Sequence, residues 1–133
     1  MENKQVKLGI IGAMDVEVAT LMDHTQDAAL SERAGMRFCE GTLAGMPVVI
    51  AKCGVGKVSA GMCVQTMCDL YGVTHIVNTG VAGSLDAQID IADLVVSTDA
   101  LYYDVDVTPW GYEPGQLPGM DCLAFPADPA LRV

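Results

Sequence analysis

The chain has 133 residues, enough for one domain with a buried core, and 51% of them are hydrophobic although only 5% are aromatic. The formal net charge of −10, with 17 acidic and 7 basic residues, argues against binding to nucleic acid or to an anionic membrane surface. Five cysteines without a CxxC pair and two isolated histidines give no disulfide framework and no zinc site. A polar N-terminal segment and the lack of a long apolar run predict a cytoplasmic protein.

Short strand-like runs then alternate with longer helix-like segments along the chain. Strands are predicted at Val6–Gly12, Met36–Leu43, Met46–Cys53, His75–Thr79 and Leu94–Ser97, and helices at Val16–His24 and Gly56–Leu70. The polar segment Thr25–Gly35 predicts a helix or an irregular connection, and Ala44-Gly45 predicts a hairpin. The expected apolar face of the second helix comprises Val58, Met62, Gln65/Thr66 and Cys68/Met67. This order predicts the α/β class, with residues 1–133 in one domain.

Three of the predicted strands end in turns of small residues, at Gly12-Ala13, Gly54-Val55-Gly56 and Gly80 to Gly83. Ligands of α/β proteins bind beyond the carboxyl ends of the strands, so three such turns favour a shared site. Each turn also has a plainer interpretation, as a tight turn or as close helix–strand packing. A P-loop is excluded, because Lys57 is followed by Val58 where that motif needs Ser or Thr.

The first of these turns leads into an acidic helix start. Asp15 is expected to cap the helix with its carboxylate. Glu17 then lies in the first helical turn, near the partial positive charge of the helix N-terminus and beside the strand end. A carboxylate at this place can bind a water molecule or a sugar hydroxyl. The alternative is a helix that merely favours acidic residues in its first turn.

A loop rich in Pro and Gly follows Thr108 and carries Trp110 and Tyr112. Aromatic side chains on such a loop often cover an apolar ligand or contact a partner subunit, and the alternative is a small local core. Asp104 and Asp106, two positions apart, indicate a solvated or structural role, because no third residue is spaced to complete a metal site.

Taken together, these segments resemble one family. The segments that carry the resemblance are GIIGAMDVEV, CGVGKVSAG, VNTGVAGSL and IADLVVSTDALYYDVDVTPWGYEPGQLPG, which are similar to the N-terminal portion of 5′-methylthioadenosine/S-adenosylhomocysteine nucleosidases. The resemblance runs from about Val6 to Phe125 and is most specific over Asp93–Gly119. It implies the purine nucleoside phosphorylase-like fold, a three-layer α/β/α arrangement with a central mixed β-sheet.

The resemblance also implies hydrolysis of the N-glycosidic bond of methylthioadenosine and S-adenosylhomocysteine, which releases adenine and a thioribose product, with no cofactor and no metal. Glu17 matches the carboxylate that activates the attacking water. The positions that match substrate-binding residues are Ala13 and Met14 on the ribose and water side, Val55 on the alkylthio side, Val81, Ala82 and Gly83 around the nucleoside, and Trp110, Tyr112 and Pro118. The last three match a loop that covers the alkylthio pocket of the other subunit of a homodimer.

Two departures from the family pattern affect these expectations. Val81 stands where the family often has Ser, so a side-chain hydroxyl contact to water is lost. The chain ends at Val133, whereas family members continue for nearly as much again and bring the acid that protonates adenine. We therefore expect very low or no activity from the 133 residues alone. The alternatives are a related hydrolase or phosphorylase, for example one acting on futalosine, and an inactive module that binds a nucleoside or dimerises.

Overall fold

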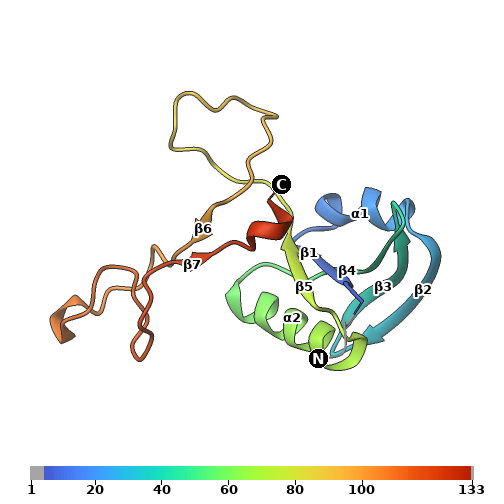
Figure 1. The fold of residues 1–133 in the computed structure, drawn as a ribbon, viewed down its shortest axis with the longest axis horizontal. Helices are drawn as coiled ribbons and strands as arrows, with labels where there is room; N and C mark the ends of the chain where they lie inside the picture. The colour runs from blue at the N-terminus through green and yellow to red at the C-terminus, as the bar shows by residue number, and fades with distance from the viewer. Residues whose placement is uncertain (1–4, 133) are drawn as a thin grey trace. The chain divides into compact units, whose positions relative to one another are not determined.

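A five-stranded mixed sheet organises the chain up to Gly83 (Figure 1). The computed structural model describes residues 5–132, so the two ends of the predicted domain, residues 1–4 and 133, lie outside the described residues. The elements of this first unit are β1 (Leu8–Gly12), α1 (Asp15–Asp23), β2 (Gln26–Arg33), β3 (Met36–Leu43), β4 (Met46–Lys52), α2 (Lys57–Tyr71) and β5 (His75–Asn78). The strand order is β2-β3-β4-β1-β5.

The sheet combines two kinds of strand pairing. Strands β2, β3 and β4 form an antiparallel meander, whereas β1 runs parallel to both β4 and β5. In the parallel part, Ile10 of the central strand lies opposite Ile50 on one side and Val77 on the other. The carboxyl ends of β4, β1 and β5 therefore meet at one edge of the sheet.

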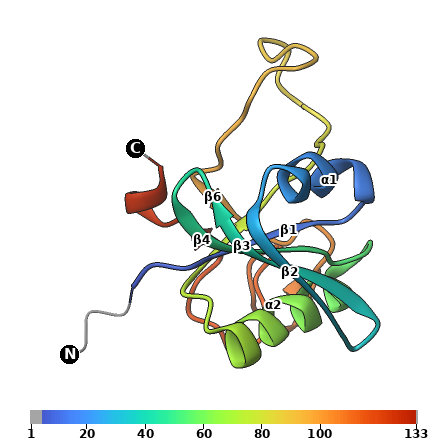
Figure 2. The same ribbon diagram turned by 90° about the vertical axis from the view of Figure 1, so that its right-hand side faces the viewer.

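The two helices cover opposite faces of this sheet (Figure 2). Because side chains alternate along a strand, Ile10 and Ile11 enter two different cores. Ile10 packs in the core that includes Val18 of α1, and Ile11 packs in the core that includes Cys63 and Met67 of α2. The expected three-layer α/β/α arrangement with a mixed sheet is thus confirmed.

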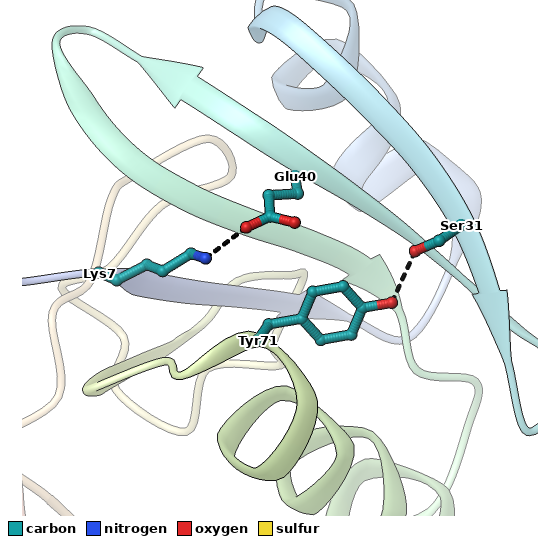
Figure 3. Close-up of polar contacts among 4 residues, drawn as sticks. All are labelled: Lys7, Ser31, Glu40 and Tyr71. Atoms are coloured by element: carbon teal, nitrogen blue, oxygen red, sulfur yellow. Dashed lines mark hydrogen bonds and ion pairs between the residues drawn. The ribbon is translucent and has the colours of Figure 1, made fainter.

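A polar contact fixes the C-terminal end of α2 against the edge of the sheet. The Tyr71 hydroxyl lies 2.6 Å from the Ser31 hydroxyl of β2, and the Tyr71 ring stacks on Phe38 of β3 at a centroid distance of 5.0 Å (Figure 3). Lys7 and Glu40 form an ion pair beside it (Figure 3). The two contacts of Tyr71 attach the last turn of α2 to the antiparallel part of the sheet.

The prediction for Thr25–Gly35 was wrong, because Gln26–Arg33 is an edge strand. Its sequence, QDAALSER, is mostly polar and exposed, so it lacks the alternation that marks a half-buried strand. The turn that follows makes it a strand: Ala34 and Gly35 both have positive φ, at 51° and 75°, and join β2 to β3 as a two-residue hairpin. The hairpin predicted at Ala44-Gly45 is confirmed and has the same geometry, with φ of 49° and 81°.

Two predictions about the helices also need correction. Asp15 does not cap α1: the N-cap is Met14, and the Asp15 carboxylate instead accepts from Lys52 Nζ at 2.8 Å. On α2 the predicted apolar face is right for Met67, which is buried, and wrong for Val58 and Met62, which are 78% and 52% accessible. The other buried residue, Cys63, was not part of that face. The helix is apolar on more than one side, so periodicity identified only part of the face that meets the sheet.

The second unit, from Ser84 onward, contains little regular structure. Its elements are β6 (Asp99–Ala100), η1 (Thr108–Trp110), β7 (Phe125–Pro126) and η2 (Pro129–Leu131). Strands β6 and β7 pair antiparallel, and Tyr102 meets Phe125 edge-to-face at 6.2 Å. The strand predicted at Leu94–Ser97 is not formed, because no described residue pairs with it and Leu94 is 91% exposed.

Candidate functional site

Hydrogen bonds join the loops that follow the three parallel strands. The N–H of Cys53 donates to the carbonyl of Gly12 at 2.8 Å, and the N–H of Thr79 donates to the carbonyl of Ile11 at 2.8 Å. The parallel pairing thus continues one residue past the ends of β4 and β5 and holds the three small-residue turns side by side. The three turns therefore lie at one edge of the sheet, and the shared ligand site that they favour stays a prediction.

Glu17 lies where two of these turns meet. It is half-buried in the first turn of α1. Its Oε2 accepts from the N–H of Met14 at 2.8 Å, and its Oε1 accepts from the N–H of Val81 at 3.1 Å. One carboxylate therefore ties the loop after β1 to the loop after β5. Since two carboxylate oxygens have four lone pairs between them, the group keeps room for a further donor.

The same contacts decide the charge of Glu17. The hydrogen bonds from Met14 and then Val81 lower the pKa of this carboxyl, burial opposes them weakly, and Ala13 adds a smaller lowering. Hydrogen bonds to a charged carboxylate favour that form. Glu17 is therefore ionised at neutral pH and acts as a proton acceptor or a negative charge, not as a proton donor.

The cysteines near the ends of the strands stay protonated. Burial raises the pKa of the Cys53 thiol, and the negative charge of Glu17 contributes to that rise. Burial also raises the pKa of Cys63 to about 11. Only a thiolate is a strong nucleophile, so neither cysteine is suited to covalent catalysis. Of these three groups, Glu17 is the one that is charged at neutral pH.

Apolar side chains surround Glu17 on the exposed rim of the three loops. Val81, next to Glu17, is 81% exposed, and Ala82 and Gly83 that follow it are also exposed. Val55 is 81% exposed in the loop after β4, between two glycines of positive φ. The loops after β4 and β5 thus each expose one valine side chain at the edge of the sheet where Glu17 lies.

The remaining predicted residues lie in the second unit. Trp110 ends η1 and is 75% exposed, Tyr112 is half-buried, and Pro118 is exposed. The segment is folded by local hydrogen bonds, from Trp110 N–H to the Val107 carbonyl at 2.9 Å and from Gly115 N–H to the Val105 carbonyl at 2.9 Å. The aromatic loop is thus an ordered unit that leaves its tryptophan accessible.

A cavity of about 450 Å³ lies elsewhere, between α1 and the antiparallel strands. Its lining consists of Asp15, Val18, Ala19, Met22, Asp23, Glu32, Gly35, Met36, Arg37 and Lys52, and it does not include Glu17.

Among residues 5–132 there is no group of three His, Cys, Asp or Glu side chains that could hold a metal ion. In the same part of the chain, no helix is long and apolar enough to cross a membrane.

A family model described as the phosphorylase superfamily matches residues 7–133. The chain belongs to this superfamily. It is 46% identical, over 92% of its own length, to the 5′-methylthioadenosine/S-adenosylhomocysteine nucleosidase of Colwellia psychrerythraea. The match covers 51% of that relative, so the chain spans about half the length of the curated relatives it matches.

Solved structures of superfamily members have the same fold. The crystal structure of a Colwellia psychrerythraea methylthioadenosine/S-adenosylhomocysteine nucleosidase in complex with adenine superposes with a TM-score of 0.93, at 44% identity, over 97% of this chain and 53% of that one. A futalosine hydrolase of Helicobacter pylori superposes with a TM-score of 0.87, at 26% identity, over 96% of this chain and 55% of that one. The resemblance that the sequence motifs indicated is confirmed.

Proposed function

We propose that this chain supplies the water-activating part of an N-glycosyl hydrolase that acts on 5′-methylthioadenosine and S-adenosylhomocysteine. The observation that carries the proposal is the Glu17 carboxylate, ionised and held by the N–H groups of Met14 and Val81 at the strand ends. The similarity to methylthioadenosine/S-adenosylhomocysteine nucleosidases supports this substrate class. The similarity to a futalosine hydrolase is lower, at 26% identity, and makes that substrate the second candidate.

The chemistry assigned to Glu17 follows from its charge. When the bond between ribose C1′ and purine N9 breaks, its electrons go to N9 and positive charge develops on the sugar, as in other glycoside cleavages. A negative carboxylate stabilises that charge, and its free lone pairs orient a water and accept the proton that the water loses as its oxygen bonds to C1′. The purine must gain a proton from another group, because the lowered pKa leaves Glu17 without one.

The proposed binding surface comprises the other predicted residues. We infer that Ala13 and Met14 face the ribose and the water, that Val55 contacts the alkylthio group, and that Val81, Ala82 and Gly83 line the nucleoside pocket. The exposure of Val55 and Val81 supports this, since both leave apolar surface open on loops that follow the parallel strands. A side-chain hydroxyl is not needed at position 81 to hold Glu17, because the contact comes from the backbone N–H.

Adenine release from methylthioadenosine, followed by chromatography, tests the proposal. The chain is assayed alone and together with the complementary half of the Colwellia psychrerythraea relative, supplied as a separate polypeptide. We expect release only from the combination, and loss of at least a hundredfold in rate with Glu17→Gln. Asp15→Asn is the matched control, since it removes one carboxylate charge from the same helical turn and its exposed ion pair contributes little. A combination that binds the substrate and releases no adenine would contradict the hydrolase proposal and leave a nucleoside-binding module.

We also propose that the protein is a homodimer in which the loop from Trp110 to Pro118 reaches the neighbouring subunit. The accessible indole of Trp110 supports this, because exposed tryptophans are enriched in protein interfaces. Sedimentation equilibrium of the native chain, Trp110→Ala and Tyr103→Ala is the test. We expect dimer dissociation with Trp110→Ala only, since Tyr103 is more exposed than Trp110 but lies outside the loop. A native chain that is monomeric throughout would overturn this proposal.

The cytoplasmic location stays a prediction.

A further inference from the structure

Gly80 occupies the turn next to Glu17 for a reason other than backbone conformation. Gly54 and Gly56, in the loop after β4, have φ of 81° and 107°, which side chains rarely adopt. Gly80 is not among the residues with positive φ, so its backbone would accept an ordinary amino acid. What distinguishes this position is the space around it.

The Glu17 carboxylate fills the place that a side chain at position 80 would take. A Cβ built on Gly80 would lie 2.5 Å from Oε1 and 2.9 Å from Cδ of Glu17, and the three nearest atoms all belong to that carboxyl group. Real Cβ atoms do not approach so closely. Because the carboxylate is the flexible end of a long side chain, an added methyl group would displace it and would leave the surrounding backbone in place.

We propose that Gly80 is a positioning residue: by lacking a side chain, it leaves the space in which the Glu17 carboxylate reaches the N–H of Val81. The consequence for catalysis rests on the proposed function, but the geometric relationship does not. With Oε1 held by Val81 and Oε2 by Met14, the carboxylate is held at both oxygens in one orientation. An alanine at position 80 breaks the first of these two contacts.

Two other glycines show that this effect is particular to Gly80. A Cβ on Gly12 would meet Val18 Cγ1 at 2.7 Å and Glu17 Cβ at 3.0 Å, so Gly12 serves the close packing of α1 on β1. A Cβ on Gly83 would meet nothing within 4 Å, and Gly83 has no positive φ. Gly83→Ala is therefore the matched control for Gly80→Ala, three residues away in the same loop.

NMR of the 133-residue chain tests the proposal without any need for turnover. The pH titration of the Glu17 side-chain carboxyl carbon gives its pKa, and the Val81 amide resonance reports the hydrogen bond through its response to the same titration. We expect Gly80→Ala to raise the Glu17 pKa toward the ordinary value and to abolish the Val81 response, and Gly83→Ala to change neither. An unchanged pKa and an unchanged Val81 response in Gly80→Ala would overturn the proposal, as would equal changes in Gly83→Ala.

A double-mutant cycle keeps the test decisive if Gly80→Ala folds poorly. Thermal unfolding is measured for Gly80→Ala alone and in a Glu17→Ala background, where the competing carboxylate is absent. We expect Gly80→Ala to lower Tm in the native background. In the Glu17→Ala background, adding Gly80→Ala should leave Tm unchanged. An equal loss in both backgrounds would show that the methyl group collides with something else, and would overturn the proposal. Neither measurement depends on adenine release, so the proposed function and this inference can fail separately.

Discussion

The Glu17 carboxylate and the Val81 N–H, 64 positions apart in the chain, are joined by a hydrogen bond of 3.1 Å. The bond connects the first turn of α1 with the loop after β5, and the parallel pairing of β1 with β5 brings the two together. The donor is a backbone group, so the contact depends on the course of the chain and not on the valine side chain. This distinction can be tested by changing the residue at position 81 in two ways.

Val81→Ser and Val81→Pro should affect Glu17 differently. Serine keeps the backbone N–H, so we expect the pKa of Glu17 to remain below its ordinary value. Proline has no N–H, so the pKa should rise, because one of the two hydrogen bonds that favour the charged form is lost. NMR titration of the Glu17 carboxyl carbon measures both. A serine variant that shifts the pKa as much as proline does would show that the side chain matters, contrary to this account.

The lowered pKa of Glu17 also makes stability depend on pH in a defined direction. Since the folded-state pKa lies below the unfolded value of about 4.3, the folded protein binds fewer protons and gains stability as pH rises through this window. The contribution is complete above the unfolded pKa and is lost as pH falls through the folded one. Urea unfolding at pH values from about 2.5 to about 6, which span the unfolded pKa of about 4.3, measures this contribution to stability.

Glu17→Gln removes this contribution, so its unfolding free energy should vary less steeply with pH than that of the native chain. Hydrogen bonds from Thr108 lower the pKa of Asp106 too, so Asp106 contributes stability with the same sign of pH dependence. Asp106→Asn measures that contribution in the second unit. If the Glu17→Gln and native curves run parallel below pH of about 4.3, the carboxylate is not held in the folded state as the hydrogen bonds indicate.

Much of the candidate site could be predicted from the sequence, because its parts are local. Glu17 follows a strand and a small-residue turn at a fixed spacing, and the family motifs surround it. The role of Gly80 could not be predicted in this way, since it depends on a side chain from a distant part of the chain. The one available signal was a glycine placed directly after a strand, and that signal is shared by many ordinary turns.

The missed strand β2 shows a different reason for failure. The residues of Gln26–Arg33 favour helix or loop, and the strand exists because its backbone pairs with β3. The informative signal lay in the connection: Ala34-Gly35 repeats the Ala44-Gly45 dipeptide that had correctly indicated the next hairpin. A cross-strand pair of opposite charge, Glu32 opposite Arg37, supports the same register. Turn chemistry was the better guide here than the composition of the strand.

Two methionines of α2, five positions apart, should differ sharply in their effect on stability. Met67 is fully buried between α2 and the sheet, and Met67→Ala should cost about 2–5 kcal/mol of unfolding free energy through lost burial and the cavity that remains. Met62 is 52% exposed, and Met62→Ala should stay within about 0.5 kcal/mol. Chemical denaturation followed by circular dichroism measures both. Equal losses would mean that α2 presents a different face to the sheet.

The contact between Tyr71 and Ser31 allows the hydrogen bond to be separated from the aromatic packing (Figure 3). Tyr71→Phe keeps the ring stacked on Phe38 and removes only the hydroxyl, so it should cost about 0.5–1.5 kcal/mol of unfolding free energy. Ser31→Ala removes the other partner. If the bond between them carries the effect, the double variant should lose less than the sum of the two single losses.

Strictly additive losses would show that the Tyr71 hydroxyl does not stabilise the protein through its contact with Ser31. The distinction matters for the fold, because β2 is an exposed edge strand with few apolar anchors. Hydrogen exchange of the β2 amides should therefore accelerate in Tyr71→Phe more than exchange in β1 and β4, which the two cores protect. Uniform acceleration across the sheet would mean that the edge strand opens only with the whole unit. Faster exchange confined to β2 would identify Tyr71 as the residue that fastens the edge of the sheet to α2.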